Sequence, residues 1–148
     1  MFYNISFYHY YNKLLFFFML RFSFLGEIMS VLIDLKPVEV EKLITENIVM
    51  FDVRRKDEWE RTGVINNSIL LTFFDEQGNY DIEKWMQEFE KHVISKDQTF
   101  VLICAHANRT RTIGNFLIEQ GYKNAAHLFG GIALWQQELR QTKEYIEA

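Results

Sequence analysis

The single cysteine of the chain, Cys104, begins the stretch CAHANRTR, directly after the apolar run TFVLI. Small residues inside this stretch let the backbone curl tightly, so that several N–H groups can point toward the sulfur. We expect a helix to begin near Thr110. Its N-terminus favours a nearby anion by about 0.3 to 1 kcal/mol, and by about 2 kcal/mol when partly buried, which lowers the pKa of the thiol by about one unit. Arg109 adds a positive charge, and His106 adds another when protonated. The pattern predicts a cradle of donors around a thiolate.

Three chemistries suit such a thiolate: transfer of a sulfane sulfur through a persulfide, transfer of a phosphoryl group, and redox exchange. Redox exchange usually uses a resolving thiol, and the chain has one cysteine, so any disulfide would have to form with a partner. Four residues separate Cys104 from Arg109, which makes a loop of six residues. Cysteine phosphatases place five residues between the two, and Arg111 does not restore that spacing because we expect it in the helix. The shorter loop suits a single terminal sulfur atom.

Length and composition indicate one globular domain without an obvious charged partner. The 148 residues can form one compact core but not two ordinary domains. The net charge of -4 gives no electrostatic footprint for nucleic acid. One cysteine cannot form an internal disulfide, and the four histidines show no pair at the spacing of metal ligands on a helix. We therefore expect neither a metal site nor a cofactor.

The first 28 residues differ from the rest because they hold half of the phenylalanines and few charges. Their longest apolar run, residues 14–20, is far short of the ~20 residues that a membrane-spanning helix needs. We expect translation to start at Met29, so that the domain spans residues 29–148 and lies in the cytoplasm. The alternatives are a signal or interfacial anchor, which would make the protein exported or membrane-associated, and a disordered aromatic tail.

After Met29, short apolar runs alternate with amphipathic helical patterns. Strands are predicted at residues 31–35, 47–53, 68–73, 99–104 and 126–129. Five helices are predicted. The first starts at Pro37 and has apolar residues at positions 40, 43 and 44, and the second covers residues 55–63. Three further helices are indicated by residues that share one face at positions 85, 89 and 93, at positions 113, 116, 117 and 120, and at positions 132, 135 and 139. Strands that are apolar on both faces predict an α/β fold, with a five-stranded parallel sheet flanked by helices on both faces.

Ligands bind beyond the carboxyl ends of the strands in such sheets, and Cys104 ends one of the two strongest strands. We expect Asp52 and Arg54 to organise the loop that follows the other strong strand, with Arg54 and Glu58 spaced for an i,i+4 ion pair. Gly130 and Gly131 predict a tight strand-to-helix turn that supports the cradle.

The sequence resembles the rhodanese-like family from about Val31 to Leu139. The segments that carry the resemblance are FDVRRKDEWERTGVINNSI, CAHANRTR and LFGGIALW. The resemblance implies a single-domain fold in which Cys104 takes sulfur from a donor and holds it as a persulfide. The bed for that sulfur is then formed by Ala105, His106, Ala107, Asn108 and Arg109. Within it, Ala107 replaces the family's usual glycine, and Val64 replaces the usual histidine after Gly63.

The resemblance therefore implies a sulfurtransferase with Cys104 as nucleophile. Its sulfur donor is expected to be thiosulfate or a protein persulfide. Its acceptor is expected to be cyanide or a thiol such as thioredoxin, glutathione or a sulfur-carrier protein. Nucleic acid and membrane are not expected as partners, and the protein is expected to be a monomer or a homodimer. The alternative is a non-catalytic sulfur-carrier or protein-binding module. A cysteine phosphatase or arsenate reductase is third, since the loop of six residues argues against it.

Overall fold

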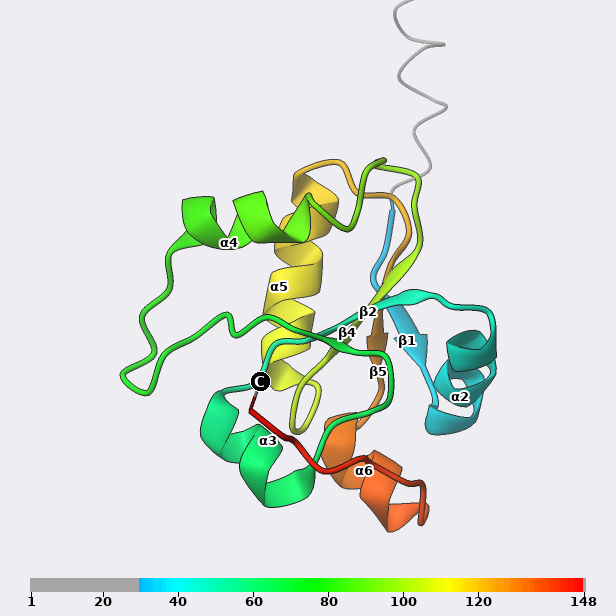
Figure 1. The fold of residues 1–148 in the computed structure, drawn as a ribbon. Helices are drawn as coiled ribbons and strands as arrows, with labels where there is room; N and C mark the ends of the chain where they lie inside the picture. Colours follow the sequence, from blue (N-terminus) through cyan, green and yellow to red (C-terminus); the bar gives the residue numbers. More distant parts are fainter. Residues whose placement is uncertain (1–29, 148) are drawn as a thin grey trace, which may run out of the picture.

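Strands and helices alternate along the chain in the computed structural model, which describes residues 30–147 (Figure 1). The elements are β1 (Ile33–Leu35), α2 (Pro37–Thr45), β2 (Val49–Asp52), α3 (Lys56–Thr62), β3 (Ile69–Leu70), α4 (Ile82–Phe89), β4 (Phe100–Ile103), α5 (Asn108–Glu119), β5 (Ala125–Leu128) and α6 (Gly131–Gln137). The predictions for residues 1–28 fall outside the described residues. Within residues 30–147, no helix combines the length and apolar character needed to cross a membrane.

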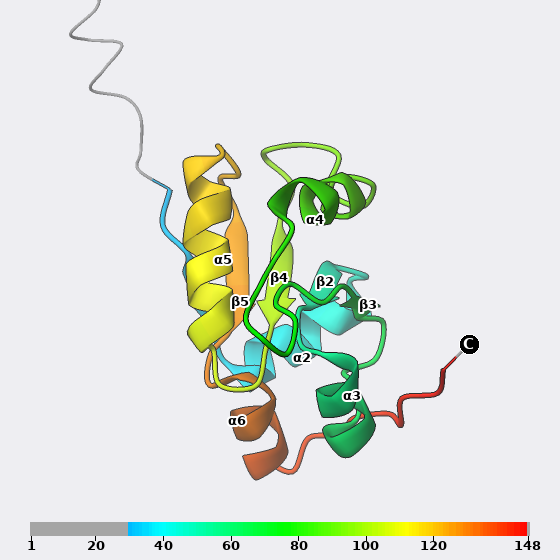
Figure 2. The same ribbon diagram turned by 90° about the vertical axis from the view of Figure 1, so that its left-hand side faces the viewer.

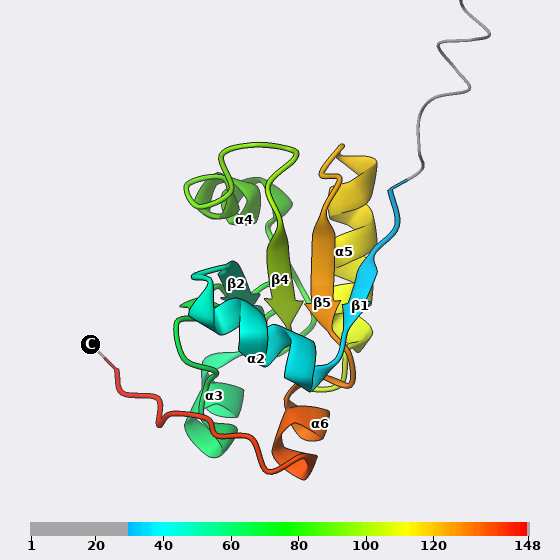
Figure 3. The same cartoon turned by 90° about the vertical axis from the view of Figure 1, so that its right-hand side faces the viewer.

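The strands form one five-stranded parallel sheet in the order β1-β5-β4-β2-β3. Figure 2 shows α4 and α5 on one face, and Figure 3 shows α2 across the other. The central strand β4 is buried throughout. Its Phe100 and Leu102 pack in the cluster that includes α4 and α5, whereas Val101 and Ile103 pack with α2 and α6. The predicted α/β fold with a buried parallel sheet is confirmed.

The helix ends differ from the sequence prediction in three places. Helix α5 begins at Asn108, so Asn108 and Arg109 lie in its first turn, before the expected start at Thr110. Val93 lies beyond the end of α4 but is still buried in the core. Leu139 was predicted on the buried face of the last helix and is 91% exposed. That prediction is wrong because α6 ends at Gln137 and the chain then turns away.

The C-terminal tail returns along α3, the helix that begins after β2 (Figure 1). Val64 forms an isolated antiparallel bridge with Lys143. Gly63 ends α3 with a φ of 69°, and a side chain there would meet the Lys143 carbonyl oxygen at 2.6 Å. Farther along the tail, Tyr145 packs against the ring of Trp59. These contacts hold α3 beside the carboxyl edge of the sheet.

Candidate active site

The thiol of Cys104 lies directly after β4, at the carboxyl edge of the sheet that the strand pattern predicted, and is 1% exposed. The neighbouring strand β2 ends at the same level, because the Val53 N–H donates to the Ile103 carbonyl at 2.9 Å. The loop from Cys104 therefore leaves the sheet beside the loop that follows Asp52. The surrounding residues therefore cover the sulfur almost completely.

The backbone of the Cys104 loop is held by its carbonyl groups, while its N–H groups stay free. The Ile132 N–H donates to the Cys104 carbonyl at 2.9 Å, and the Ala133 N–H donates to the Ala105 carbonyl at 3.0 Å. Among the described residues, no backbone carbonyl accepts a hydrogen bond from the N–H groups of residues 105–110. A run of free N–H groups at a helix N-terminus is an anion-binding arrangement.

The two hydrogen bonds from Ile132 and Ala133 to the loop carbonyls, here called the clamp, require a glycine at position 131. Gly131 has a φ of 63°, and a Cβ there would lie 2.4 Å from the Cys104 carbonyl oxygen. A residue with a side chain would push α6 away from the loop. The Gly130–Gly131 turn thus lets the first N–H groups of α6 reach the loop carbonyls.

Ala107 adopts the left-handed conformation, with a φ of 65°, as the residue that caps α5. This conformation costs an L-residue with a side chain about 1–2 kcal/mol. Ala107 is also buried, and its carbonyl accepts hydrogen bonds from the Arg111 N–H and the Thr110 hydroxyl. The loop therefore keeps a strained residue in the position where the resembled family has glycine.

Replacing Ala107 with glycine should raise the free energy of unfolding by about 0.5–1 kcal/mol, because the relief of strain exceeds the entropy that glycine adds to the unfolded chain. Urea unfolding followed by tryptophan fluorescence measures this change. Ala105→Gly is the matched control, since Ala105 does not have a positive φ, and it should leave stability unchanged or lower it. Equal effects of the two substitutions would contradict a strained Ala107.

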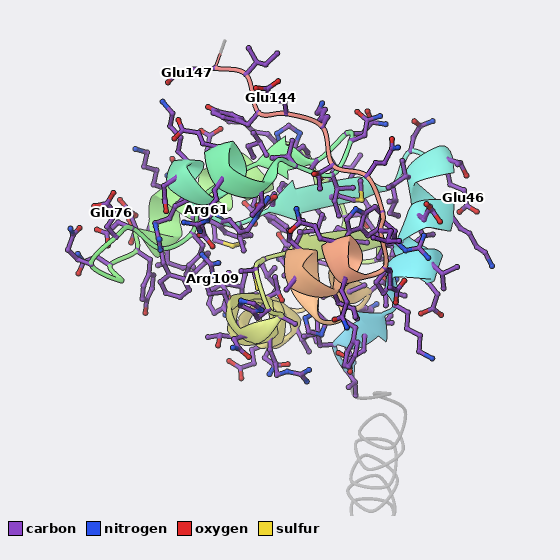
Figure 4. All side chains as sticks on the ribbon, turned by 90° about the horizontal axis from the view of Figure 1, so that it is seen from below. Glu46, Arg61, Glu76, Arg109, Glu144 and Glu147 are labelled. Carbon is purple, nitrogen blue, oxygen red and sulfur yellow. The ribbon has the colours of Figure 1, made fainter. Side chains whose placement is uncertain are left out.

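Arg109 is bound by a carboxylate from α3 rather than by the loop. Its Nη1 and Nη2 donate to the two carboxylate oxygens of Glu58 at 2.7 and 2.6 Å. Figure 4 looks onto the carboxyl edge of the sheet and places Arg109 between α5 and α3. From the sequence, this guanidinium was expected to lie beside an anion held by the loop. Its bidentate partner in the structure is Glu58, which fixes α3 to the first turn of α5.

The pKa values of this pair reflect the contact. Burial alone would raise the pKa of Glu58, but hydrogen bonds from the Arg109 side chain and the Arg55 N–H, with the positive charges of both residues, lower it to about 2. The hydrogen bond to Glu58 is the largest effect on Arg109 and raises its pKa, and the nearby charges of Cys104 and Asp52 act in the same direction. Glu58 is therefore ionised, and Arg109 charged, at any pH near neutrality.

Glu58→Gln should destabilise the fold by roughly 3 kcal/mol at pH 7. The folded-state pKa of about 2 lies below the ordinary value of 4.5, so this stabilisation is present above pH 4.5 and is lost as the pH falls toward 2. Urea unfolding at several pH values should show the wild type and the variant converging across that window. Glu60→Gln, an exposed change on the same helix, should cost less than about 1 kcal/mol. A gap between wild type and Glu58→Gln that stays constant down to pH 2 would refute the assignment.

Asp52 and Arg54 form a buried ion pair at the end of β2. Their side chains are 0% and 1% exposed, and Arg54 Nη2 lies 2.6 Å from Asp52 Oδ2. Arg54 also donates to the Thr62 hydroxyl at 2.6 Å and to the Gly63 carbonyl at 2.8 Å. The predicted Arg54–Glu58 ion pair is wrong, since Arg54 reaches only the Glu58 backbone carbonyl and Asp52 takes its charge. The pair ties β2 to the C-terminus of α3.

The remaining residues of the predicted site differ in exposure. Ala105 is half-buried, while the side chains of His106 and Asn108 are exposed. Sequence reasoning missed two residues: Glu58 as the partner of Arg109, and Thr110, whose hydroxyl lies 3.6 Å from the Cys104 sulfur. Thr110 is fully buried. A hydroxyl residue six positions after the only cysteine was the signal available for it.

Residues 36–138 match the family model described as the rhodanese-like domain. Thiosulfate sulfurtransferase GlpE of Pseudoalteromonas translucida is 27% identical over 97 residues, which cover 66% of this chain and 81% of that protein. Rhodanese domain-containing protein CG4456 of Drosophila melanogaster is 27% identical over 94 residues, which cover 62% of this chain and 85% of that one.

Solved structures agree on the fold. The polysulfide-sulfur transferase homodimer of Wolinella succinogenes has a TM-score of 0.60 at 24% identity, covering 77% of this chain and 80% of that one. A rhodanese-related protein of Thermoplasma volcanium has a TM-score of 0.55 at 23% identity, covering 74% of this chain and 95% of that one. With the family model matched over most of the described residues, the chain belongs to the rhodanese-like domain family.

Proposed function

We propose that the chain is a sulfurtransferase in which Cys104 receives a sulfane sulfur and passes it to an acceptor. The observation that carries the proposal is the run of free backbone N–H groups at residues 105–110, beside a buried thiol. Such groups can stabilise an anion in a site from which water is excluded. The relatives named thiosulfate sulfurtransferase support thiosulfate as the donor.

In the proposed reaction, the Cys104 thiolate attacks the outer sulfur of thiosulfate. The sulfur–sulfur bond of thiosulfate breaks, its electron pair leaves with sulfite, and a Cys104 persulfide anion remains. The loop N–H groups stabilise the terminal sulfur, and the charge of Arg109, held by Glu58, lies nearby. An acceptor such as cyanide, or the thiolate of glutathione, thioredoxin or a sulfur-carrier protein, then attacks the terminal sulfur and regenerates the Cys104 thiolate.

The test is the intact mass of the full chain after exposure to thiosulfate, measured before any reductant is added. The expected result is a gain of about 32 mass units, one sulfur atom, which cyanide or a thiol removes. A Cys104→Ser control should show no gain. Hydrolysis of an aryl phosphate, measured in parallel, should be absent.

A gain from a persulfide donor but not from thiosulfate would favour the sulfur-carrier alternative. No gain from either donor, with the domain folded, would overturn sulfur transfer altogether.

A further inference from the structure

His127 is a fully buried titratable side chain that the proposed sulfur transfer does not use. It lies in β5 and is 0% exposed. Both of its ring nitrogens have partners: Nδ1 lies 2.8 Å from the Thr110 hydroxyl, and Nε2 bonds to Asp34 Oδ1. Burying a polar group costs free energy unless the group is hydrogen-bonded. Both ring nitrogens of His127 are bonded, and these bonds connect β5 to α5 through Thr110 and to β1 through Asp34.

These contacts extend to the sulfur. The Thr110 hydroxyl that meets His127 also lies 3.6 Å from Cys104 Sγ. Asp34 stands opposite His127 in the pairing of β1 with β5, and its side chain is 48% exposed. An unbroken chain, here called the relay, therefore runs from the buried thiol through Thr110 and His127 to Asp34 at the surface.

The single proton of the Thr110 hydroxyl has three acceptors within reach: the Ala107 carbonyl, His127 Nδ1 and, when it is a thiolate, the Cys104 sulfur. When this proton leaves the Ala107 carbonyl, two arrangements connect the sulfur with the imidazole. An ionised Asp34 only accepts, so His127 Nε2 carries a proton. When Nδ1 is bare, the Thr110 hydroxyl donates to it, and the Cys104 S–H donates to the Thr110 oxygen. When Nδ1 carries a proton, it donates to the Thr110 oxygen, and the Thr110 hydroxyl donates to a thiolate. The two arrangements differ by one proton moved from sulfur to imidazole.

We propose that the relay takes up the thiol proton of Cys104. The S–H bond breaks as its proton passes to the Thr110 oxygen, and the Thr110 hydroxyl proton forms the new N–H bond at His127 Nδ1. A thiolate and an imidazolium result, and the Asp34 carboxylate balances the imidazolium charge. Thr110 touches the reacting sulfur and is a catalytic residue, whereas His127 and Asp34 act through it as positioning residues. The inference rests on the proposed function, for which it supplies the nucleophile.

Other charges also face the relay, and the test has to separate their effects. At its outer end, Arg111 lies 3.5 Å from Asp34 Oδ1. At the sulfur end stand the Arg109–Glu58 pair and the Asp52–Arg54 pair, with the exposed His106 in the loop between. Since Arg109 also favours a thiolate, a useful variant must break the relay and leave Arg109 in place.

Thr110→Val meets this requirement because it removes the hydroxyl and keeps the shape of the side chain. It also removes the contact of the hydroxyl with the Ala107 carbonyl, which Asp34→Asn leaves in place. The measurement is the rate at which iodoacetamide alkylates Cys104 in the full chain, as a function of pH. We expect the rate at pH 7 to fall about tenfold and the pH of half-maximal rate to rise by about one unit. Thr110→Ser should restore the wild-type profile, and Thr112→Val, an exposed change on the same helix, should not alter it. A wild-type profile in Thr110→Val would overturn the relay.

Two further measurements keep the test valid if Thr110→Val does not fold. Asp34→Asn is a half-exposed change that keeps an acceptor for Nε2 and removes the charge, and it should shift the alkylation profile in the same direction. Nitrogen-15 NMR of the His127 ring should show an imidazolium at neutral pH in the wild type and a neutral ring in Cys104→Ser. Equal ring protonation in these two proteins would leave His127 a purely structural residue.

Failure of the relay and failure of the proposed function give different results. Sulfur uptake with unshifted alkylation profiles would keep the sulfurtransferase and reject the relay. Shifted profiles without sulfur uptake would keep the relay and reject sulfur transfer.

Discussion

Asp52→Ala is expected to lower the free energy of unfolding by about 3–5 kcal/mol, because it leaves the guanidinium of Arg54 buried without its counter-charge. Arg54 is 1% exposed and cannot turn to solvent without unpacking the end of β2. It would also lose the carboxylate that orients it toward Thr62 and Gly63. The loss should extend to α3 and therefore to the Glu58 carboxylate that holds Arg109.

Urea unfolding at pH 7 measures this effect. Asp57→Ala is the control, because it breaks the salt bridge between Asp57 in α3 and Arg55, the residue that caps this helix. The two side chains are 45% and 33% exposed, so the change should cost less than about 1 kcal/mol. Replacing Asp52 with leucine and Arg54 with methionine together should cost less than Asp52→Ala, because no buried charge is left unpaired. If Asp52→Ala cost no more than Asp57→Ala, the buried pair would have no part in holding α3.

Gly131→Ala should lower stability by about 2–4 kcal/mol and slow sulfur uptake by Cys104 by a factor of ten or more. The added Cβ would lie 2.4 Å from the Cys104 carbonyl oxygen and 2.5 Å from the Ala105 carbonyl carbon. Both contacts are with backbone atoms, so no rotation of a side chain relieves them. Either α6 or the loop must move, and the loop N–H groups would then leave their positions around the sulfur.

Gly121→Ala is a matched control because Gly121 also has a positive φ, 91°, but a Cβ there meets nothing within 4 Å. It should show the backbone strain alone, about 1–2 kcal/mol, with sulfur uptake unchanged. The difference between the two variants measures the contact between α6 and the loop. Equal losses of stability and unchanged uptake in both would contradict the clamp.

Most of the fold could be predicted from local signals. The strand runs, the helix that begins at Pro37 and the stop at Gly63 depend on residues close in sequence, and the parallel sheet follows from strands that are apolar on both faces. Leu139 was wrongly predicted to be buried because the helical spacing of apolar residues continues to position 139, although α6 ends at Gln137. Nothing in its own apolar character shows that α6 stops at Gln137.

The partners within the site were less predictable because they lie far apart in sequence. The i,i+4 spacing offered Arg54 as a local partner for Glu58, but Asp52 binds Arg54 and leaves Glu58 to Arg109, 51 residues away. Which carboxylate pairs with which guanidinium depends on how the elements pack in three dimensions, and the local spacing of the residues does not show this. The contact of His127 with Asp34 spans 93 residues, and its only sequence signal is a histidine alone among apolar residues in AAHLF.

The hydrogen bonds from α6 to the Cys104 loop also set an order of events during synthesis. Cys104 leaves the ribosomal exit tunnel before Ile132 and Ala133, whose N–H groups bind the loop carbonyls. The first strand must likewise wait for the last, since Ile33 pairs with Ala126. While α6 is still inside the exit tunnel, the nascent chain carries a thiol without its clamp, open to oxidants in the surrounding solution. The sulfur therefore gains its full shelter only after α6 has left the tunnel.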